Sequence, residues 1–215
     1  MKTRDLLVAA MLMTGCNAIA QEEIKLPEPD KSAKSMSVVE ALNTRHSVRE
    51  YDSEALSAQE LSNLCWAACG VTRDNDHRTA PSALNKKEIR LFVFDKKGVY
   101  EYDAVTNKLT LKAKGDHRSL IAGGKNFKQD FVLEAPVSLL MVIDFERFGG
   151  KDEKSLMFGC VDAGNVSENI NLYCQSAGLV TVPRATHDTE GISTLLGFTE
   201  MQLPIMNNPV GKPKK

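Results

Sequence analysis

The chain has 215 residues, of which 42% are hydrophobic and 26% charged, and this fits one folded domain with an extension. Its 27 Lys and Arg residues nearly balance 28 Asp and Glu residues, so charge gives no reason to expect a nucleic-acid partner. The four His residues lack the spacing of metal ligands, and the chain has no G-x-S-x-G motif. We therefore expect neither a metal site nor a serine hydrolase.

The first 20 residues have the pattern of a secretory signal peptide. Lys2 and Arg4 precede an apolar run over residues 6–13, which is too short to span a bilayer. Residues 13–16 resemble a bacterial lipoprotein signal in which Cys16 becomes lipid-modified, whereas residues 18–20 fit ordinary A-x-A cleavage. We expect an exported bacterial protein, either periplasmic or anchored to the membrane as a lipoprotein, and we favour the lipoprotein.

Residues 21–36 are charged, contain proline and show no periodicity, so we expect a flexible tether there. The folded domain is predicted over residues 37–215. Four cysteines follow the signal, and an oxidising compartment would allow a disulfide between them. Their positions in apolar helical patterns instead predict buried side chains for all four, namely Cys65, Cys69, Cys160 and Cys174.

Helices are predicted from caps and apolar spacing. Ser37 and Ser57 each begin an S-x-x-E capping box, so helices should run from there to about Asn43 and to Gly70. Apolar residues recur at helical spacing over residues 161–177 and predict a long helix that ends at Gly178. Two shorter helices are expected, capped by Asp116 and Asp188 and ending near Ala122 and Leu196.

Strands are predicted from β-rich runs. Residues 137–143 are continuously apolar after Pro136, which is typical of a strand buried on both faces and so central in its sheet. The other runs suggest a hairpin of residues 89–94 with 99–102, and strands at 108–112, 179–182 and 202–206. The sum predicts an α+β domain with a mostly antiparallel central sheet flanked by helices.

Three segments carry polar groups suited to binding. Arg45, His46, Ser47 and Arg49 concentrate anion-binding donors between two helices, although a solvated basic loop would look the same. Residues 78–85 form a small-residue loop in which Ser82 and Asn85 can present hydrogen bonds, or else a plain turn. Residues 209–214 hold cations on a Pro- and Gly-constrained loop, or form a frayed basic tail.

Taken in order, these segments resemble the nitroreductase family, and within it the branch of thiazole- and oxazole-forming dehydrogenases of the SagB type. The resemblance covers about residues 37–213. It rests on six segments in register, which are residues 45–49, 64–71, 79–83, 98–102, 162–170 and 209–211. Asn165 and Glu168 depart from the His and Gln common in that branch, and residues 182–185 lack its glycines.

The resemblance implies a homodimer with one FMN in each of two clefts built from both subunits. Arg45 and Ser47, with His46 between them, would hold the phosphate end of the flavin, helped by Lys212 or Lys214. Arg49 would lie at the pyrimidine edge of the ring. The other subunit would contribute Pro81, Ser82 and Ala83, and more weakly Asn85. A backbone N–H from Val182, Pro183, Arg184 or Ala185 would reach flavin N5, although Pro183 itself has no such donor.

No side chain is expected to act as nucleophile or base, since the flavin N5 carries the chemistry. The predicted function is an exported FMN-dependent oxidoreductase that moves two electrons between a reductant and nitroaromatic, quinone-like or other small electron-poor substrates. Two alternatives stay open, a flavin-remodelling enzyme and a non-catalytic flavin- or ligand-binding lipoprotein. NAD(P)H is mainly cytoplasmic, so for an exported protein a membrane redox partner or quinol is the expected donor.

Overall fold

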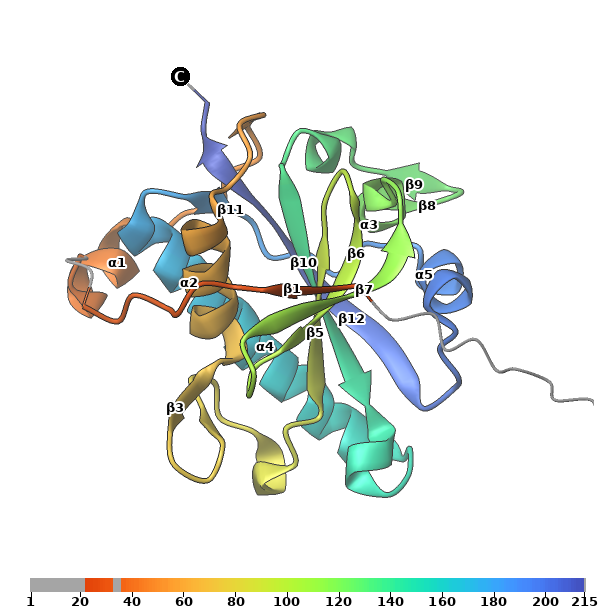
Figure 1. The fold of residues 1–215 in the computed structure, drawn as a ribbon. Coiled ribbons are helices and arrows are strands. Elements are labelled where there is room, and N and C mark those ends of the chain that lie inside the picture. The colour runs from red at the N-terminus through yellow and green to blue at the C-terminus, as the bar shows by residue number, and fades with distance from the viewer. Residues whose placement is uncertain (1–21, 33–35, 215) are drawn as a thin grey trace, which may run out of the picture.

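The computed structural model describes residues 22–32 and 36–214. Its α+β fold is built on one antiparallel sheet in the order β1-β7-β6-β5-β10-β12-β11, and β2 pairs with the C-terminal end of β12 (Figure 1). The strands of this sheet are β1 (Glu23–Lys25), β2 (Tyr51–Asp52), β5 (Ile89–Phe94), β6 (Gly98–Asp103), β7 (Lys108–Lys114), β10 (Val137–Asp144), β11 (Val180–Thr181) and β12 (Gln202–Pro213). Two small ribbons lie apart from it, β3 (Val71–Arg73) with β4 (His77–Arg78) and β8 (Gly123–Gly124) with β9 (Phe127–Lys128).

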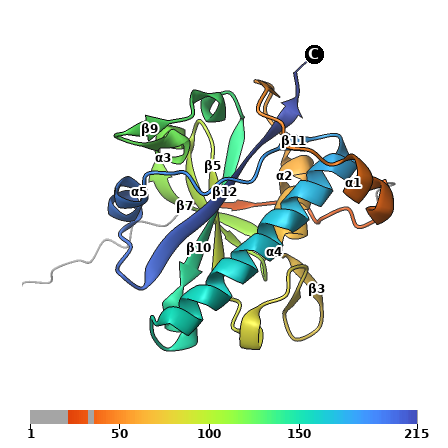
Figure 2. The ribbon, with the colours of Figure 1, turned by 180° about the vertical axis from the view of Figure 1, so that it is seen from behind.

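Helices cover both faces of the sheet (Figures 1 and 2). One face packs against α2 and α4, and the other against α3 and α5. The helices are α1 (Val38–Thr44), α2 (Ala58–Cys69), α3 (Arg118–Ala122), α4 (Glu153–Ala177) and α5 (Thr189–Leu196), with short 3-10 turns η1 (Ala83–Asn85), η2 (Asp130–Leu133) and η3 (Phe145–Phe148). This arrangement confirms the predicted α+β fold.

The side chains of the central strands divide between two hydrophobic clusters. On β5, Leu91 and Val93 face the α2 and α4 side, whereas Phe92 and Phe94 face the α3 and α5 side. This alternation follows from the two-residue period of a strand. Every residue of β10 is buried, so the prediction of a central strand at residues 137–143 is confirmed.

The helix ends follow the predicted caps, with one exception. Ser57 accepts a hydrogen bond from the Glu60 N–H at 3.2 Å, and the Glu60 carboxylate accepts one from the Ser57 N–H at 2.6 Å. Gly178 ends α4 with φ of 71°, a conformation that glycine adopts without steric cost. Asp116 is not the N-cap of α3, because His117 occupies that position without a side-chain cap bond; Asp116, one position earlier, accepts from the N–H of Arg118, the first residue of the helix.

The predicted tether is largely part of the fold. Strand β1 pairs in antiparallel register with β7, Glu23 opposite Thr110 and Lys25 opposite Lys108. Leu26 is only 3% exposed and belongs to the core cluster of the α2 and α4 side. A single buried leucine among charged residues carries no periodic signal, so composition alone predicted a flexible segment where the chain forms an edge strand.

The C-terminal segment also differs from the prediction. Residues 202–206 were expected to be the last extended piece, but β12 continues to Pro213 and pairs with β10, β11 and β2 in turn. Residues 209–213 are therefore sheet rather than a loop or a frayed tail. Among the cysteines, Cys65, Cys69 and Cys174 are buried as predicted, whereas Cys160 is exposed on α4, and all four are free thiols.

The predicted signal peptide, including Cys16, lies outside the described residues. Within residues 22–32 and 36–214, no helix is long and apolar enough to cross a membrane.

Candidate functional site

The basic loop at residues 45–50 lies along one end of the sheet. The Val48 N–H donates to the Thr181 carbonyl on β11 at 3.0 Å. The Val48 carbonyl accepts from the Tyr51 hydroxyl at 3.0 Å, and the Tyr51 side chain is buried. Figures 1 and 2 show this loop beside β11 and near the end of β12. The fold thus brings together the three segments predicted to hold the flavin from one subunit.

The donors of this loop remain available to a ligand. Arg45 has an exposed side chain whose Nε lies 4.0 Å from the Glu168 carboxylate, a contact too long for a hydrogen bond. His46 Nδ1 lies 3.1 Å from the Thr44 carbonyl. Ser47 and Arg49 are exposed, and within residues 22–32 and 36–214 their side chains have no hydrogen bond or ion pair. Two guanidiniums and a hydroxyl on one exposed loop form a donor set that suits a phosphate.

The C-terminal lysines divide between two roles. Lys212 Nζ lies 2.5 Å from the Glu54 carboxylate and 3.8 Å from that of Glu60. The hydrogen bond to Glu54 raises the pKa of Lys212. Lys212 is thus already paired with acidic residues, whereas Lys214 follows the end of β12 and is exposed. Of the two lysines predicted to reach a phosphate, Lys214 is the one without a carboxylate partner in the described chain.

The segment at residues 182–185 is less open than predicted. The Arg184 N–H donates to the Asn207 carbonyl at 2.8 Å and is not free for a flavin atom. The Arg184 side chain is buried, and its guanidinium donates to Gln129 Oε1, Asn207 Oδ1 and the carbonyls of Ile121 and Ala122. Arg184 therefore ties β12 to the α3 region instead of facing a ligand. Val182 is buried, Pro183 half-buried and Ala185 exposed.

Arg49 and Arg184 place two positive charges near each other at this end of the sheet. Burial lowers the pKa of Arg184, and the positive charge of nearby Arg49 adds to that shift. The Arg184 guanidinium also lies 5.6 Å from the centre of the Phe131 ring. An anion bound near Arg49 and Arg184 would be attracted by both positive charges.

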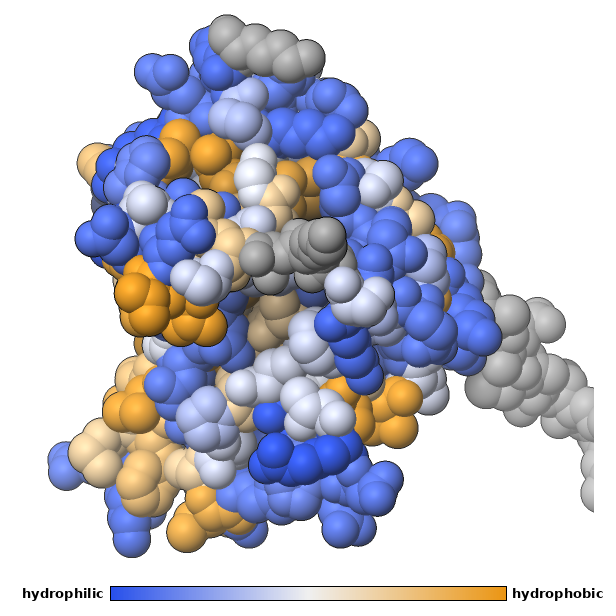
Figure 3. Space-filling model, turned by 90° about the vertical axis from the view of Figure 1, so that its left-hand side faces the viewer, coloured by the Kyte–Doolittle hydropathy of each residue, from blue (hydrophilic) through white to orange (hydrophobic). Residues whose placement is uncertain are grey.

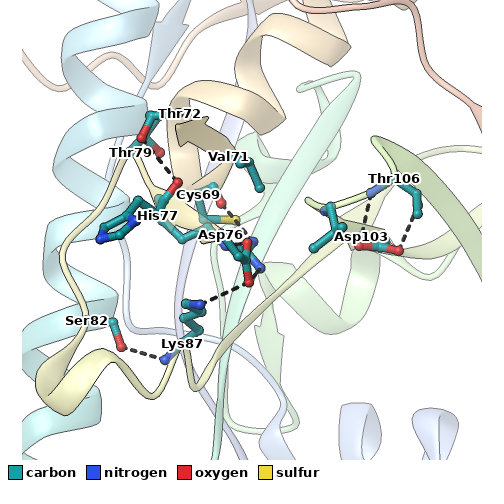
Figure 4. A network of polar contacts seen from close by, with 12 residues as sticks. Cys69, Val71, Thr72, Asp76, His77, Thr79, Ser82, Lys87, Asp103 and Thr106 are labelled. Carbon is teal, nitrogen blue, oxygen red and sulfur yellow. Dashed lines mark hydrogen bonds and ion pairs between the residues drawn. The ribbon is translucent and has the colours of Figure 1, made fainter. Parts of the chain in front are cut away.

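The loop at residues 81–85 lies at the opposite end of the molecule (Figures 1 and 2). Its side chains and backbone are fixed by two buried carboxyl groups. The Ser82 hydroxyl donates to Glu88 at 2.9 Å, and the Ala83 N–H donates to Asp162 on α4 at 2.5 Å. Lys87 and Asp76 extend this network to the β3–β4 ribbon (Figure 4). Pro81 and Asn85 are exposed on the same loop. Within one chain, residues 81–85 and residues 45–49 therefore lie at different ends of the molecule.

The sequence analysis missed Glu88 and Asp162. A signal existed for Asp162, because it shares with Val166 and Ile170 the four-residue spacing that places side chains on one helix face, here the buried one. A carboxyl in such a row requires a partner. Glu88 directly precedes β5 and resembles a surface residue in sequence. In the described chain, no group of three or more His, Cys, Asp or Glu side chains is placed to hold a metal ion.

Comparison with known proteins defines the class. The family model of the nitroreductase family matches residues 42–212, which is most of the chain. The chain belongs to the nitroreductase family.

Individual relatives agree with this assignment. A crystal structure from Ralstonia eutropha JMP134, provisionally described as a nitroreductase, is 34% identical, with a TM-score of 0.81 over 90% of each chain. A Methanocaldococcus jannaschii protein provisionally named a nitroreductase is 29% identical over 202 residues, 88% of this chain and 96% of that protein. The Bacillus subtilis oxidoreductase YcnD, 22% identical with a TM-score of 0.61 over 84% of this chain and 68% of its own, shares the fold.

Proposed function

We propose that this protein is an FMN-dependent oxidoreductase that works as a homodimer. The observation that carries the proposal is the set of exposed donors at residues 45–49, held by β11 and β2 at one end of the sheet. Within the described residues, the side chains of Ser47 and Arg49 have no hydrogen bond or ion pair. A loop without a ligand would more commonly pair its guanidiniums with the carboxylates around it, as Lys212 does with Glu54. These donors fit the phosphate and pyrimidine edge of FMN.

In this proposal the chain positions the cofactor and tunes its charge. Arg45 and Ser47 hold the phosphate, with Lys214 as the additional cation. Arg49 lies at the pyrimidine edge, where a positive charge stabilises the anionic reduced flavin and raises its potential. The flavin, when bound, supplies two-electron transfer at N5. Ala185, which is exposed after the buried Arg184, is the residue of this segment whose backbone N–H would reach the flavin N5.

The homodimer is proposed from the separation of the two predicted half-sites. Residues 45–49 lie near Glu168 on α4, whereas residues 81–85 are bound to Asp162 on the same helix at the other end of the molecule. In this proposal the two loops contact one flavin from different subunits. A second subunit would bring its own residues 81–85 to the first subunit's basic loop.

Exposed hydrophobic side chains are consistent with a subunit interface. Figure 3, which views the side of the molecule carrying α1, shows hydrophobic patches at the surface among hydrophilic residues. Val39 on α1 is 77% exposed and Val161 on α4 is 58% exposed, and the two helices are in contact. A contiguous hydrophobic patch of this kind commonly marks a protein interface, so we propose that α1 and α4 contribute to the subunit contact.

The substrate class is proposed from the family and the electron donor from the predicted export. We propose small electron-poor acceptors, such as nitroaromatic or quinone-like compounds, and a donor other than a nicotinamide, namely a membrane redox partner or quinol. The test is stopped-flow reduction of the flavin. We expect slow reduction by NADH and NADPH and fast reduction by a soluble quinol. Fast reduction by nicotinamides at low micromolar concentrations would contradict the proposed donor.

The cofactor is tested by the flavin absorbance of the purified protein after FMN addition and desalting. We expect about one FMN per chain in the parent and a loss of that absorbance in an Arg45→Ala and Arg49→Ala double variant. The matched control is Lys96→Ala with Lys97→Ala, which removes two exposed charges from the β5–β6 turn. Folded, dimeric parent protein that retains no flavin would overturn the assignment and leave a family fold with a different use.

A further inference from the structure

Two carboxyl groups meet in the interior beneath the loop at residues 81–85. Glu88 is 0% exposed and Asp162 is 4% exposed. Glu88 Oε2 accepts from the Ser82 hydroxyl and Asp162 Oδ2 accepts from the Ala83 N–H, so each carboxyl holds one side of the loop. These are the contacts that fix Ser82 and Ala83 in place.

One oxygen of this pair has no donor from the protein. Within the described residues, Glu88 Oε1 is buried and has no hydrogen-bond partner. An unsatisfied buried acceptor is costly, and two carboxylates in contact cannot both be ionised at low cost. The Asp162 carboxyl is a neighbour of Glu88, because the two groups hold the adjacent residues Ser82 and Ala83. A proton between the two groups supplies the missing donor and removes one charge.

The loop itself requires restraint. Leu84, Asn85 and Lys87 all have φ of 54°, in the left-handed region that residues other than glycine rarely adopt. The Lys87 N–H donates to the Ser82 hydroxyl at 2.6 Å (Figure 4). The same hydroxyl donates to Glu88. Consecutive residues in this conformation persist only when surrounding contacts over-determine them. Ser82 and Ala83 provide those contacts through the carboxyl pair.

We propose that Glu88 and Asp162 share one proton and act together as positioning residues that hold the loop at residues 81–85 in its flavin-contacting shape. The flavin-contacting role of the loop rests on the proposed function, whereas the shared proton does not. Loss of the proton places two negative charges side by side, weakens the hold on Ser82 and Ala83, and releases the loop.

The charged groups near Glu88 and Asp162 are paired with other partners and do not neutralise the two carboxyl groups. Lys87 and Arg78, from the loop and from β4, are both paired with Asp76. Asp144, on β10 beside the Glu88 backbone, accepts from Gln202. Burial, and then the hydrogen bond to Asp162, raises the pKa of Glu88 to about 7. The folded protein therefore keeps a proton that the unfolded chain loses above pH 4.5. The stabilisation is complete below that pH and is lost as the pH rises through about 7.

The test compares the parent protein with Glu88→Gln and Asp162→Asn, whose amides can donate permanently to the partner oxygen. Infrared difference spectra between pH 6 and pH 8.5 should show a protonated carboxylic acid that disappears with rising pH in the parent and is missing from both variants. Amide exchange of residues 82–87, corrected for intrinsic rates, should lose protection at the higher pH in the parent only. The same pH shift should lower FMN retention in the parent and leave it unchanged in Glu88→Gln.

These readouts separate the two proposals. If no form of the protein binds FMN, the proposed function fails, but the infrared and exchange measurements still decide the shared proton. Absence of a titrating carboxylic acid in the parent, or its persistence in Glu88→Gln, would overturn the pair. If the amide protection of residues 82–87 falls with rising pH equally in the parent and in the variants, then another group holds the loop. If Glu88→Gln fails to fold, Asp162→Asn gives the same comparison.

Discussion

At the scale of single residues, the chain uses its arginines in two opposite ways. Arg45 and Arg49 are exposed at the surface of the basic loop, whereas Arg184 is buried and donates to four acceptors. The sequence places all three within segments expected to contact a cofactor, and only the structure separates a binding role from a structural one. Composition cannot make this distinction, because a guanidinium suits both a phosphate and a set of buried carbonyls.

The two roles predict different effects on stability. Arg184→Ala leaves Gln129, Asn207 and two backbone carbonyls without their donor, so we expect it to lower the free energy of unfolding by about 3 kcal/mol. Arg49→Ala removes an exposed side chain and should change it by less than about 0.5 kcal/mol. Urea unfolding followed by circular dichroism measures both. Equal small effects would mean that Arg184 is not the link between β12 and the α3 region.

At the scale of elements, the patterns that repeat along the chain predict structure well. The buried run of β10, the capping box of α2 and the hairpin of β5 with β6 all lie where the sequence predicts them. Their signals are local, because each depends on spacing within a few residues. The basic loop and the loop at residues 81–85 were also predicted as candidate binding segments.

The elements that sequence patterns missed depend on distant partners. Strand β1 exists because β7 offers an edge, more than 80 positions along the chain, and because Leu26 enters the core. The carboxyl pair of Glu88 and Asp162 forms only when β5 packs against α4. Pairings of this kind leave no periodic signal in either segment.

Two substitutions, one at a buried position and one at an exposed position, test whether the β1 segment contributes to the stability of the fold. Leu26 is buried, so Leu26→Ala should lower the free energy of unfolding by about 2–4 kcal/mol through lost apolar contact and a residual cavity. Ile24 is 40% exposed on the strand itself, and Ile24→Ala should cost less than about 1 kcal/mol. Chemical denaturation of the folded domain gives both values. A Leu26→Ala protein as stable as the parent would support the tether that composition suggests.

At the scale of the whole molecule, the proposed site requires two chains. The basic loop and residues 81–85 lie at opposite ends of one subunit, and α4 runs between them (Figure 2). The same helix exposes Met157 and Val161, which are 55% and 58% accessible. If α4 is the centre of the proposed subunit interface, then assembly and cofactor binding are one event, because each flavin of the proposed site would take a loop from each subunit.

This coupling predicts the behaviour of a charged interface. Met157→Glu with Val161→Glu keeps good helix formers on α4 but places carboxylates where two helices would meet, so we expect sedimentation to show monomers. The same variant should lose FMN retention although no predicted flavin contact has changed, and its circular dichroism should match that of the parent. The control is Val105→Glu, because Val105 is 66% exposed in the turn between β6 and β7 and away from α4. A monomer that retains flavin would show that one subunit suffices, and a variant that stays dimeric would move the interface to another face of the molecule.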